Sequence, residues 1–165
     1  MYKLYTDGAT TGNGKENPIG GYAWALLRDD ELIDYASYSI APATNNICEM
    51  MAIIRGCEEA LVYLKEFDKI EVYSDSAYCV NCYKQNWWKA WIHNNWVNSK
   101  KEPVKNRELW EEIIPYFTDA RFDFVKVKGH NGDKYNEFVD KLAVEAKFGK
   151  VEKADKFFPM EERNG

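Results

Sequence analysis

Short apolar segments in the first forty residues alternate with polar turns, as in an antiparallel sheet. We expect strands over residues 2–6, 21–27 and 32–40, with a charged turn at 29–31 between the last two. A segment rich in Gly and Asn, residues 12–18, separates the first strand from the second. The pattern therefore predicts that a β-meander opens the domain.

A segment with helical spacing of apolar residues follows the meander. Thr44 or Asn45 can cap a helix that continues to about residue 64. Apolar or small residues occupy two faces of this helix: Ile47, Met50, Met51, Ile54, Leu61 and Leu64 on one, and Ile53, Gly56 and Ala60 on the other. Because so much of its circumference is apolar, we expect this helix to be central.

The second half of the chain alternates between strand and helix patterns. The expected elements are a strand at 69–73, helices from near Ser76 and Trp87, a helix at 106–117, a strand at 121–127 and a helix at 133–148. Together with the meander they predict an α/β fold, a five-stranded mixed sheet flanked by helices. We place this domain at residues 1–149. The sequence does not decide whether the charged tail, 150–165, docks on it.

Charge is distributed unevenly along the 165 residues. A content of 45% hydrophobic residues excludes a mainly disordered chain. The net charge of −5 argues by itself against a nucleic-acid partner. Between Cys79 and Arg107, however, six basic residues and one acid give +5, which leaves −10 for the remainder. This cationic segment is a more specific indication than the net charge.

The four cysteines indicate neither a disulfide framework nor a zinc site. Cys79 and Cys82 have metal-like spacing, but the sequence lacks a second pair to complete the ligand set. We expect both thiols to be half-buried and reduced on a helix. Without a signal segment at the start or an apolar run of membrane-spanning length, we expect a cytoplasmic protein with no membrane contact, and a monomer.

Four carboxylates occur where ordinary packing does not explain them. Asp7 and Asp75 each end a predicted strand and meet at one sheet edge if those strands are parallel neighbours. Glu49 falls in the first turn of the central helix, on a packed face, and Asp140 lies in the last helix. Clustered acids repel one another and lose hydration unless a cation compensates. A shared site for hard metal ions is the economical interpretation, and it indicates phosphoryl transfer.

Each carboxylate also has a structural interpretation. Asp7 before Gly8 can form a turn, and Asp75 can cap the next helix. Asp140 alone fits a solvated helix face. Glu49 is the hardest to explain structurally, and a joint role explains all four more simply than four separate reasons.

Five motifs follow one another along the chain: Thr6-Asp7-Gly8, Thr44 to Ala52, Ser74-Asp75-Ser76, Lys128-Gly129-His130-Asn131-Gly132 and Asn136-Glu137-Phe138-Val139-Asp140. Together they closely resemble type 1 ribonuclease H, from the first strand to about Lys147. The resemblance implies an endonuclease that hydrolyses the RNA strand of RNA–DNA hybrids by two-metal-ion catalysis. It also implies Mg²⁺ as the cofactor, with Mn²⁺ as a substitute, and 5′-phosphate and 3′-hydroxyl ends.

The resemblance assigns roles to the site residues. Asp7 bridges two ions, Glu49 and Asp75 help hold one, and Asp140 helps hold the other. Two ions about 4 Å apart can clamp the attacking water and the departing oxygen of an in-line displacement. His130 alone would be a surface loop histidine. Beside the carboxylates it becomes a proton carrier or an aid to product release, because imidazole titrates near neutrality.

Strand choice requires recognition of the 2′-hydroxyl, since only RNA carries it. Asn45 and Asn46 have both donor and acceptor capacity, and Asn13 in the first loop is a further candidate. Capping and turn formation are the structural alternatives for these residues. Where the family often has a polar residue two positions after Asp75, this chain has Ala77. One contact to the RNA strand is therefore missing or made by the backbone.

By the same resemblance the DNA strand follows Tyr78, Trp87 and Trp91, with Thr44 and Asn106 holding one DNA phosphate. Four of the six tryptophans lie at positions 87–96, interleaved with lysines, which fits sugar stacking and phosphate contact. Their structural alternative is a satellite hydrophobic cluster. This segment is less basic than the family's usual substrate-handling protrusion, so we expect weaker hybrid binding with steep salt dependence.

Other interpretations come from different functional classes. An exonuclease or recombinase-type nuclease of the same wider fold is disfavoured by the ordered Asn-Asn-x-x-Glu and Gly-His-x-Gly elements. A catalytically silent hybrid-binding module is disfavoured by the complete set of four carboxylates. A metal-storing or structural domain leaves the segment rich in Trp and Lys unexplained.

Overall fold

The structure, a computed structural model, describes residues 1–11, 18–127 and 133–153. Here a five-stranded sheet has the order β3-β2-β1-β4-β5. Its strands are β1 (Tyr2–Thr10), β2 (Gly20–Arg28), β3 (Glu31–Ile40), β4 (Ile70–Ser74) and β5 (Phe122–Lys126). The first three strands pair antiparallel, whereas β4 is parallel to both β1 and β5. The predicted mixed sheet with an opening meander is confirmed.

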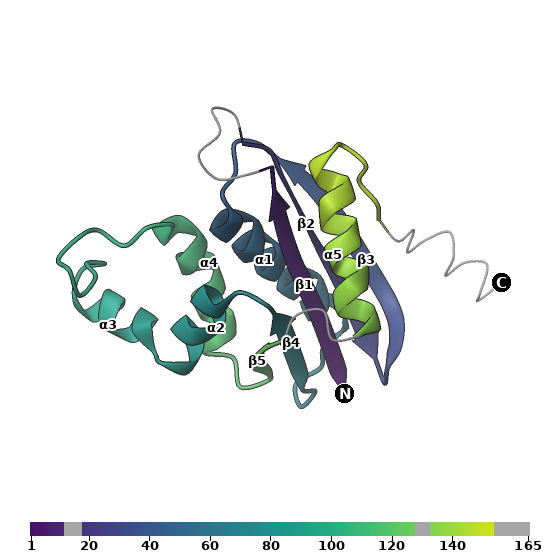
Figure 1. Cartoon of the computed structure of the whole chain (residues 1–165). Helices are drawn as coiled ribbons and strands as arrows, with labels where there is room; N and C mark the ends of the chain where they lie inside the picture. The colour runs from purple at the N-terminus through teal and green to yellow at the C-terminus, as the bar shows by residue number, and fades with distance from the viewer. Residues whose placement is uncertain (12–17, 128–132, 154–165) are drawn as a thin grey trace.

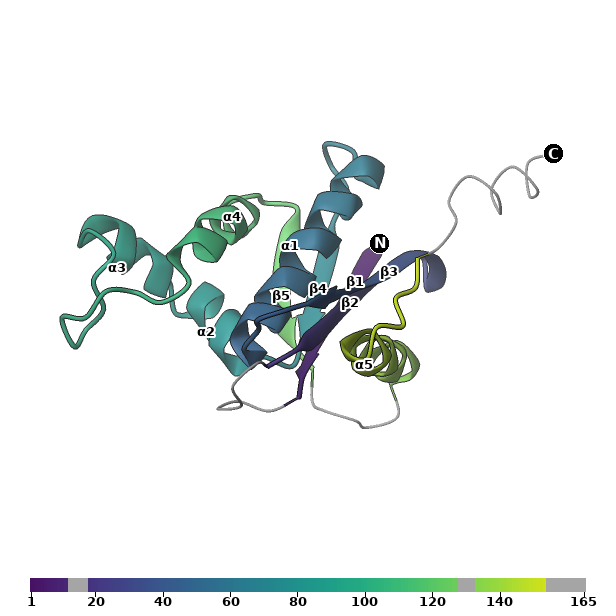
Figure 2. The same cartoon turned by 90° about the horizontal axis from the view of Figure 1, so that it is seen from above.

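Helices cover both faces of the sheet (Figure 1). α1 (Asn45–Tyr63) packs on one face, and α5 (Lys134–Lys147) packs on the other, against β1, β2 and β3. Figure 2 shows the sheet between these two helices. The shorter helices are α2 (Ala77–Lys84), α3 (Trp87–His93) and α4 (Arg107–Phe117), and they lie on the α1 side. Among the described residues, no helix is both long enough and apolar enough to cross a membrane.

Alternating side chains of β2 build the core on both faces of the sheet. Trp24 and Leu26 belong to the cluster shared with α1, whereas Ala23, Ala25 and Leu27 belong to the cluster shared with α5. All five are at most 2% exposed. Because a slip of one residue would exchange the two sets, burial on both faces fixes the register of β2 against its neighbours.

A close approach between β2 and α5 fixes the position of that helix. A Cβ atom on Gly21 would lie 2.6 Å from the backbone nitrogen of Lys147 and would collide with the carbonyl oxygen of Ala143. Only glycine allows the helix backbone to come this near. The C-terminal half of α5 is therefore held directly against the sheet.

The strand β1 is longer than predicted, so Asp7 lies inside it rather than at its end. β1 pairs with β2 as far as Thr10, but its parallel ladder with β4 stops at the pair Tyr5–Tyr73. The segment from Asp7 to Gly8 has the composition of a turn, and pairing with β2, the next strand along the chain, keeps it extended. Asp7 nevertheless stands at the end of the parallel ladder.

The described residues also show where the two closely spaced cysteines lie and where the tail begins. Cys79 and Cys82 lie on α2 as predicted, but they are buried rather than half-buried, and burial raises the pKa of both thiols to about 12. After α5 the chain docks on β3, where the Ser37 amide donates to the carbonyl oxygen of Glu152 at 2.7 Å and Lys153 bridges Ala36. The tail thus docks on β3 through residues 152 and 153, and the part after them lies outside the described residues.

Candidate active site

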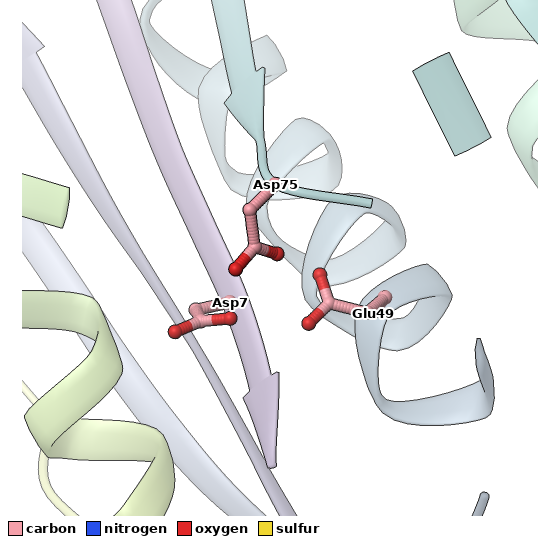
Figure 3. A group of neighbouring side chains, drawn as sticks. All are labelled: Asp7, Glu49 and Asp75. Carbon is pink, nitrogen blue, oxygen red and sulfur yellow. The ribbon is translucent and has the colours of Figure 1, made fainter. Parts of the chain in front are cut away.

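Three of the four predicted carboxylates converge from separate segments. Asp7 lies on β1, Glu49 on α1 and Asp75 directly after β4, and Figure 3 shows their carboxyl groups gathered in one place. Each contributes one oxygen, and these oxygens lie within 4.8 Å of one another. Parallel pairing explains the meeting, because Tyr5 pairs with Tyr73 and each aspartate stands two residues further along its chain segment.

At Gly8 the backbone of β1 lies directly against α1. Its amide donates to Oδ1 of Asp7 at 2.9 Å and to Oε1 of Glu49 at 3.0 Å. A Cβ atom at this position would lie 2.6 Å from Cβ of Cys48 and 2.7 Å from the backbone nitrogen of Glu49. The turn interpretation of Asp7 is wrong, because Asp7 and Gly8 both lie within β1. The sequence analysis missed the role of Gly8, although a glycine inside a strand pattern is a signal of close backbone approach.

In the described part of the chain, the buried carboxylate of Glu49 has an oxygen that is free to bind a cation. It is the fifth residue of α1, whose first turn contains no acidic residue, so the predicted first-turn position is wrong by about one residue. Only 9% of Glu49 is exposed, and its Oε2 has no hydrogen-bond partner among the described residues. A buried acceptor without a partner is costly. Clustered carboxylate oxygens are the ligands that Mg²⁺ prefers, so the residues present fit a divalent ion.

Asp140 joins the group from α5. It is half-buried and close enough to Asp7 to raise the pKa of that carboxyl group, but it is not one of the residues whose oxygens lie within 4.8 Å of one another. Its solvated-face interpretation is wrong. The capping interpretation of Asp75 is also wrong, because Ser76 caps α2 by accepting from the Cys79 amide at 3.1 Å. The structure thus brings all four predicted carboxylates to one place.

Burial and mutual repulsion raise the pKa of two of these carboxyl groups. For Asp7 burial is the largest cause and the charge of Asp75 adds to it, so that the pKa rises to about 8. Burial, followed by the charges of Asp7 and Asp75, raises the pKa of Glu49 well above its ordinary value. Without metal the site therefore retains protons at neutral pH, and a divalent ion would displace them.

We expect the metal-free protein to lose stability as the pH rises from about 4 to about 8. Over this interval the folded state keeps a proton on Asp7, whereas the unfolded chain releases it near pH 4, so the folded state binds more protons and its stability falls with pH. Thermal unfolding in EDTA at a series of pH values measures this. Asp7→Asn should flatten the profile, and identical profiles for the parent and the variant would contradict the assignment.

The predicted contacts to a DNA phosphate share one groove. Thr44, Asn45 and Asn46 line it together with Lys105 and Asn106, two segments that are far apart in the sequence. Thr44 also caps α1, because its hydroxyl accepts from an amide of the first turn at 3.1 Å. The side chains of Asn45 and Asn46 are exposed. Lys105 is a groove residue that the sequence analysis counted only in the charge of its segment.

The aromatic residues predicted to follow the DNA strand begin beside this groove. The Tyr78 hydroxyl accepts from Nε1 of Trp110 at 3.0 Å and lies close to the side chain of Asn106. Trp87 and Trp91 are half-buried on α3, with ring centroids 6.4 Å apart, and both line a hollow of about 410 Å³. Trp91 also packs on the buried Trp110. The tryptophans therefore belong to a hydrophobic cluster and also line an open surface.

Two predicted site residues lie outside the described residues. His130 falls in segment 128–132 and Asn13 in segment 12–17, so their roles stay predictions. The other histidine, His93, is exposed on α3. Ala77, where the family often has a polar residue, is the first residue of α2 and is also exposed.

Comparison with known proteins supports a family assignment. The sequence model of the RNase H family matches residues 1–148. A curated ribonuclease H from Clostridium botulinum (strain Hall) is 45% identical over 143 residues, which cover 87% of this chain and 93% of that protein.

Two solved structures share the fold. The foamy viral protease–reverse transcriptase in complex with an RNA/DNA hybrid has a TM-score of 0.78 at 19% identity, over 90% of this chain and 20% of that one. LC11-RNase H1, also in complex with an RNA/DNA hybrid, has a TM-score of 0.62 at 22% identity, over 90% of this chain and 98% of that one. The family match and the curated relative show that the chain belongs to the ribonuclease H family and is a nuclease.

Proposed function

We propose that this protein is an endoribonuclease that hydrolyses the RNA strand of RNA–DNA hybrids by two-metal-ion catalysis and leaves 5′-phosphate and 3′-hydroxyl ends. The convergence of Asp7, Glu49 and Asp75, with Asp140 beside Asp7, carries the proposal. Family membership and the hybrid complexes of the two similar structures support the choice of substrate. In this proposal residues 1–149 are the catalytic unit and act as a monomer in the cytoplasm.

The arrangement of the carboxylates suggests which metal ion each of them would bind. When bound, two Mg²⁺ ions, or Mn²⁺ in their place, would supply activation of the attacking water and stabilisation of the leaving 3′-oxygen. Asp7 interacts with each of the other three carboxylates, which fits a ligand common to both ions. Glu49 and Asp75 would then help hold one ion, and Asp140 would help hold the other. His130 remains the proposed proton carrier.

The groove and the aromatic hollow suggest how a hybrid would lie. In our proposal Thr44 and Asn106 hold a DNA phosphate from the two sides of their groove. Asn45 and Asn46 precede Glu49 on α1, so they can meet the 2′-hydroxyls of an RNA strand seated at the carboxylates. Further contacts are proposed with the RNA strand at Asn13 and with the DNA strand at Tyr78, Trp87 and Trp91.

A cleavage assay on matched substrates tests the proposed function. A hybrid labelled uniformly in its RNA strand, the same sequence as duplex DNA, and the single-stranded RNA are each incubated with the protein in Mg²⁺ or in EDTA. We expect internal cuts only in the RNA of the hybrid, and only with Mg²⁺. Equal cleavage of duplex DNA, or cleavage that EDTA does not stop, would overturn the proposal.

Hybrid binding should weaken steeply with salt. The segment from Cys79 to Arg107 carries +5, so we expect the logarithm of affinity to fall against the logarithm of salt concentration with a slope of about −4. Lys105→Gln should reduce the size of this slope by about 1, because Lys105 lines the phosphate groove. Fluorescence anisotropy in EDTA measures both slopes. Lys141→Gln, an exposed position on α5, is the control, and tight binding that ignores salt would contradict the prediction.

A further inference from the structure

We propose that Tyr5 is a positioning residue, which aligns the carboxylates by tying α5 to the strand that carries Asp7. The inference rests on the proposed function, since it concerns the same site. Tyr5 lies outside the five motifs that resemble the family. Tyr5 is 7% exposed, and its hydroxyl group belongs neither to the proposed metal ligands nor to the proposed hybrid contacts.

The hydroxyl of Tyr5 crosses from the sheet to the start of α5. It donates to Oδ2 of Asp133 at 3.0 Å. Oδ1 of the same carboxylate accepts from the amides of Tyr135 at 3.1 Å and Asn136 at 3.4 Å, and so caps the helix. The two oxygens of Asp133 therefore have separate tasks. Oδ1 accepts hydrogen bonds from free backbone amides in the first turn of α5, and Oδ2 attaches that turn to β1 through Tyr5.

The ring of Tyr5 contacts a second strand. It stacks on Tyr73 of β4, with centroids 4.8 Å apart and 13° between the ring planes. These two tyrosines are register partners at the end of the parallel ladder. From the strand that carries Asp7, this side chain thus contacts the two segments that lead to Asp75 and Asp140.

The tie matters because Asp140 lies between two places where α5 closely approaches the sheet. Near its C-terminal end the helix backbone lies against Gly21, and at its start Asp133 is bound by Tyr5. Asp140 lies seven residues after Asp133, about 10 Å along the helix axis. Without the bond between Tyr5 and Asp133 the start of α5 is fixed less firmly to β1, and Asp140 can shift relative to Asp7. Small misplacements of catalytic groups are costly to the rate.

Tyr5→Phe tests the tie, since it keeps the stacked ring and removes only the hydroxyl. We expect kcat for hybrid cleavage to fall about tenfold and the half-saturating Mg²⁺ concentration to rise. KM for the hybrid should stay the same, because the groove and α3 are not involved. The control is Tyr83→Phe, which removes a hydroxyl that donates to Asp123 between α2 and β5 at 3.3 Å. It should behave like the parent.

A double-mutant cycle separates positioning from general packing. Asp133→Ser keeps a capping oxygen but is too short to reach Tyr5, so Tyr5→Phe should add no further loss in that background. Amide hydrogen exchange gives a readout that needs no activity. The amides of Tyr135 and Asn136 should exchange faster in Tyr5→Phe than in the parent.

Three results decide the inference. Parental kcat, Mg²⁺ dependence and amide exchange in Tyr5→Phe would overturn it, and so would additive losses in the cycle. An equal fall in kcat in Tyr83→Phe would also overturn it, because the effect would then not be specific to α5. If the parent itself does not cut hybrids, the proposed function fails instead, and the exchange of the two amides still decides whether Tyr5 fixes the start of α5.

Discussion

Asp7→Asn should reduce Mg²⁺-dependent cleavage of an RNA–DNA hybrid by about a thousandfold or more. Asparagine keeps the shape of the side chain but removes its charge. Because Asp7 interacts with Glu49, Asp75 and Asp140, the change affects every proposed metal position. Single-turnover cleavage by the parent and the variant measures the effect at saturating protein.

The loss should not come from unfolding. In EDTA at pH 8 the variant should be more stable than the parent by about 1–3 kcal/mol, because a neutral side chain relieves both the burial of charge and the repulsion around Asp7. Asp123→Asn, on the exposed side of β5, is the matched control and should retain activity. An Asp7→Asn protein that cuts at the parental rate would remove the catalytic assignment of Asp7.

Gly8→Ala should damage both stability and catalysis. The added methyl group would lie 2.6 Å from Cβ of Cys48 and 2.7 Å from the backbone nitrogen of Glu49, and neither atom can turn aside. α1 must therefore move away from β1, which separates Glu49 from Asp7. We expect a loss of about 2–4 kcal/mol in the free energy of unfolding and about a hundredfold loss in kcat.

Denaturant unfolding and cleavage by the folded fraction separate these two effects. Gly56→Ala is the control, because it also adds a methyl group between α1 and the sheet. There the nearest atoms are side-chain carbons of Leu4 and Trp24, at 2.9–3.0 Å, and the position is remote from the carboxylates. It should lose less stability and keep the parental kcat when folded. Parental stability and activity in Gly8→Ala would contradict the close packing of β1 on α1.

Local patterns were sufficient to predict the fold. The short apolar segments of the meander and the apolar faces of α1 lie where the sequence places them, because each element buries its own apolar residues. The end of β1 was predicted too early. Asp7 and Gly8 have turn composition, and the pairing with β2 that keeps them extended is not visible from their neighbours in sequence.

The site was predictable where it depended on residue type and strand order, and not where it depended on contacts between elements. Asp7 and Asp75 meet because β1 and β4 are parallel neighbours, which is the condition that the sequence analysis set for their meeting. The amide of Gly8 between two carboxylates and the hydroxyl of Tyr5 on Asp133 join residues that are far apart in the chain. Neither pair has a sequence signal beyond a glycine in a strand and an aspartate before a helix.

Anomalous diffraction from crystals of the protein with a hybrid and Mn²⁺ is the most direct test of the metal site. The account predicts two peaks about 4 Å apart, both within bonding distance of Asp7, with Glu49 and Asp75 around one and Asp140 beside the other. Saturating Mn²⁺ that supports cleavage but leaves no peak at Asp7 would contradict it.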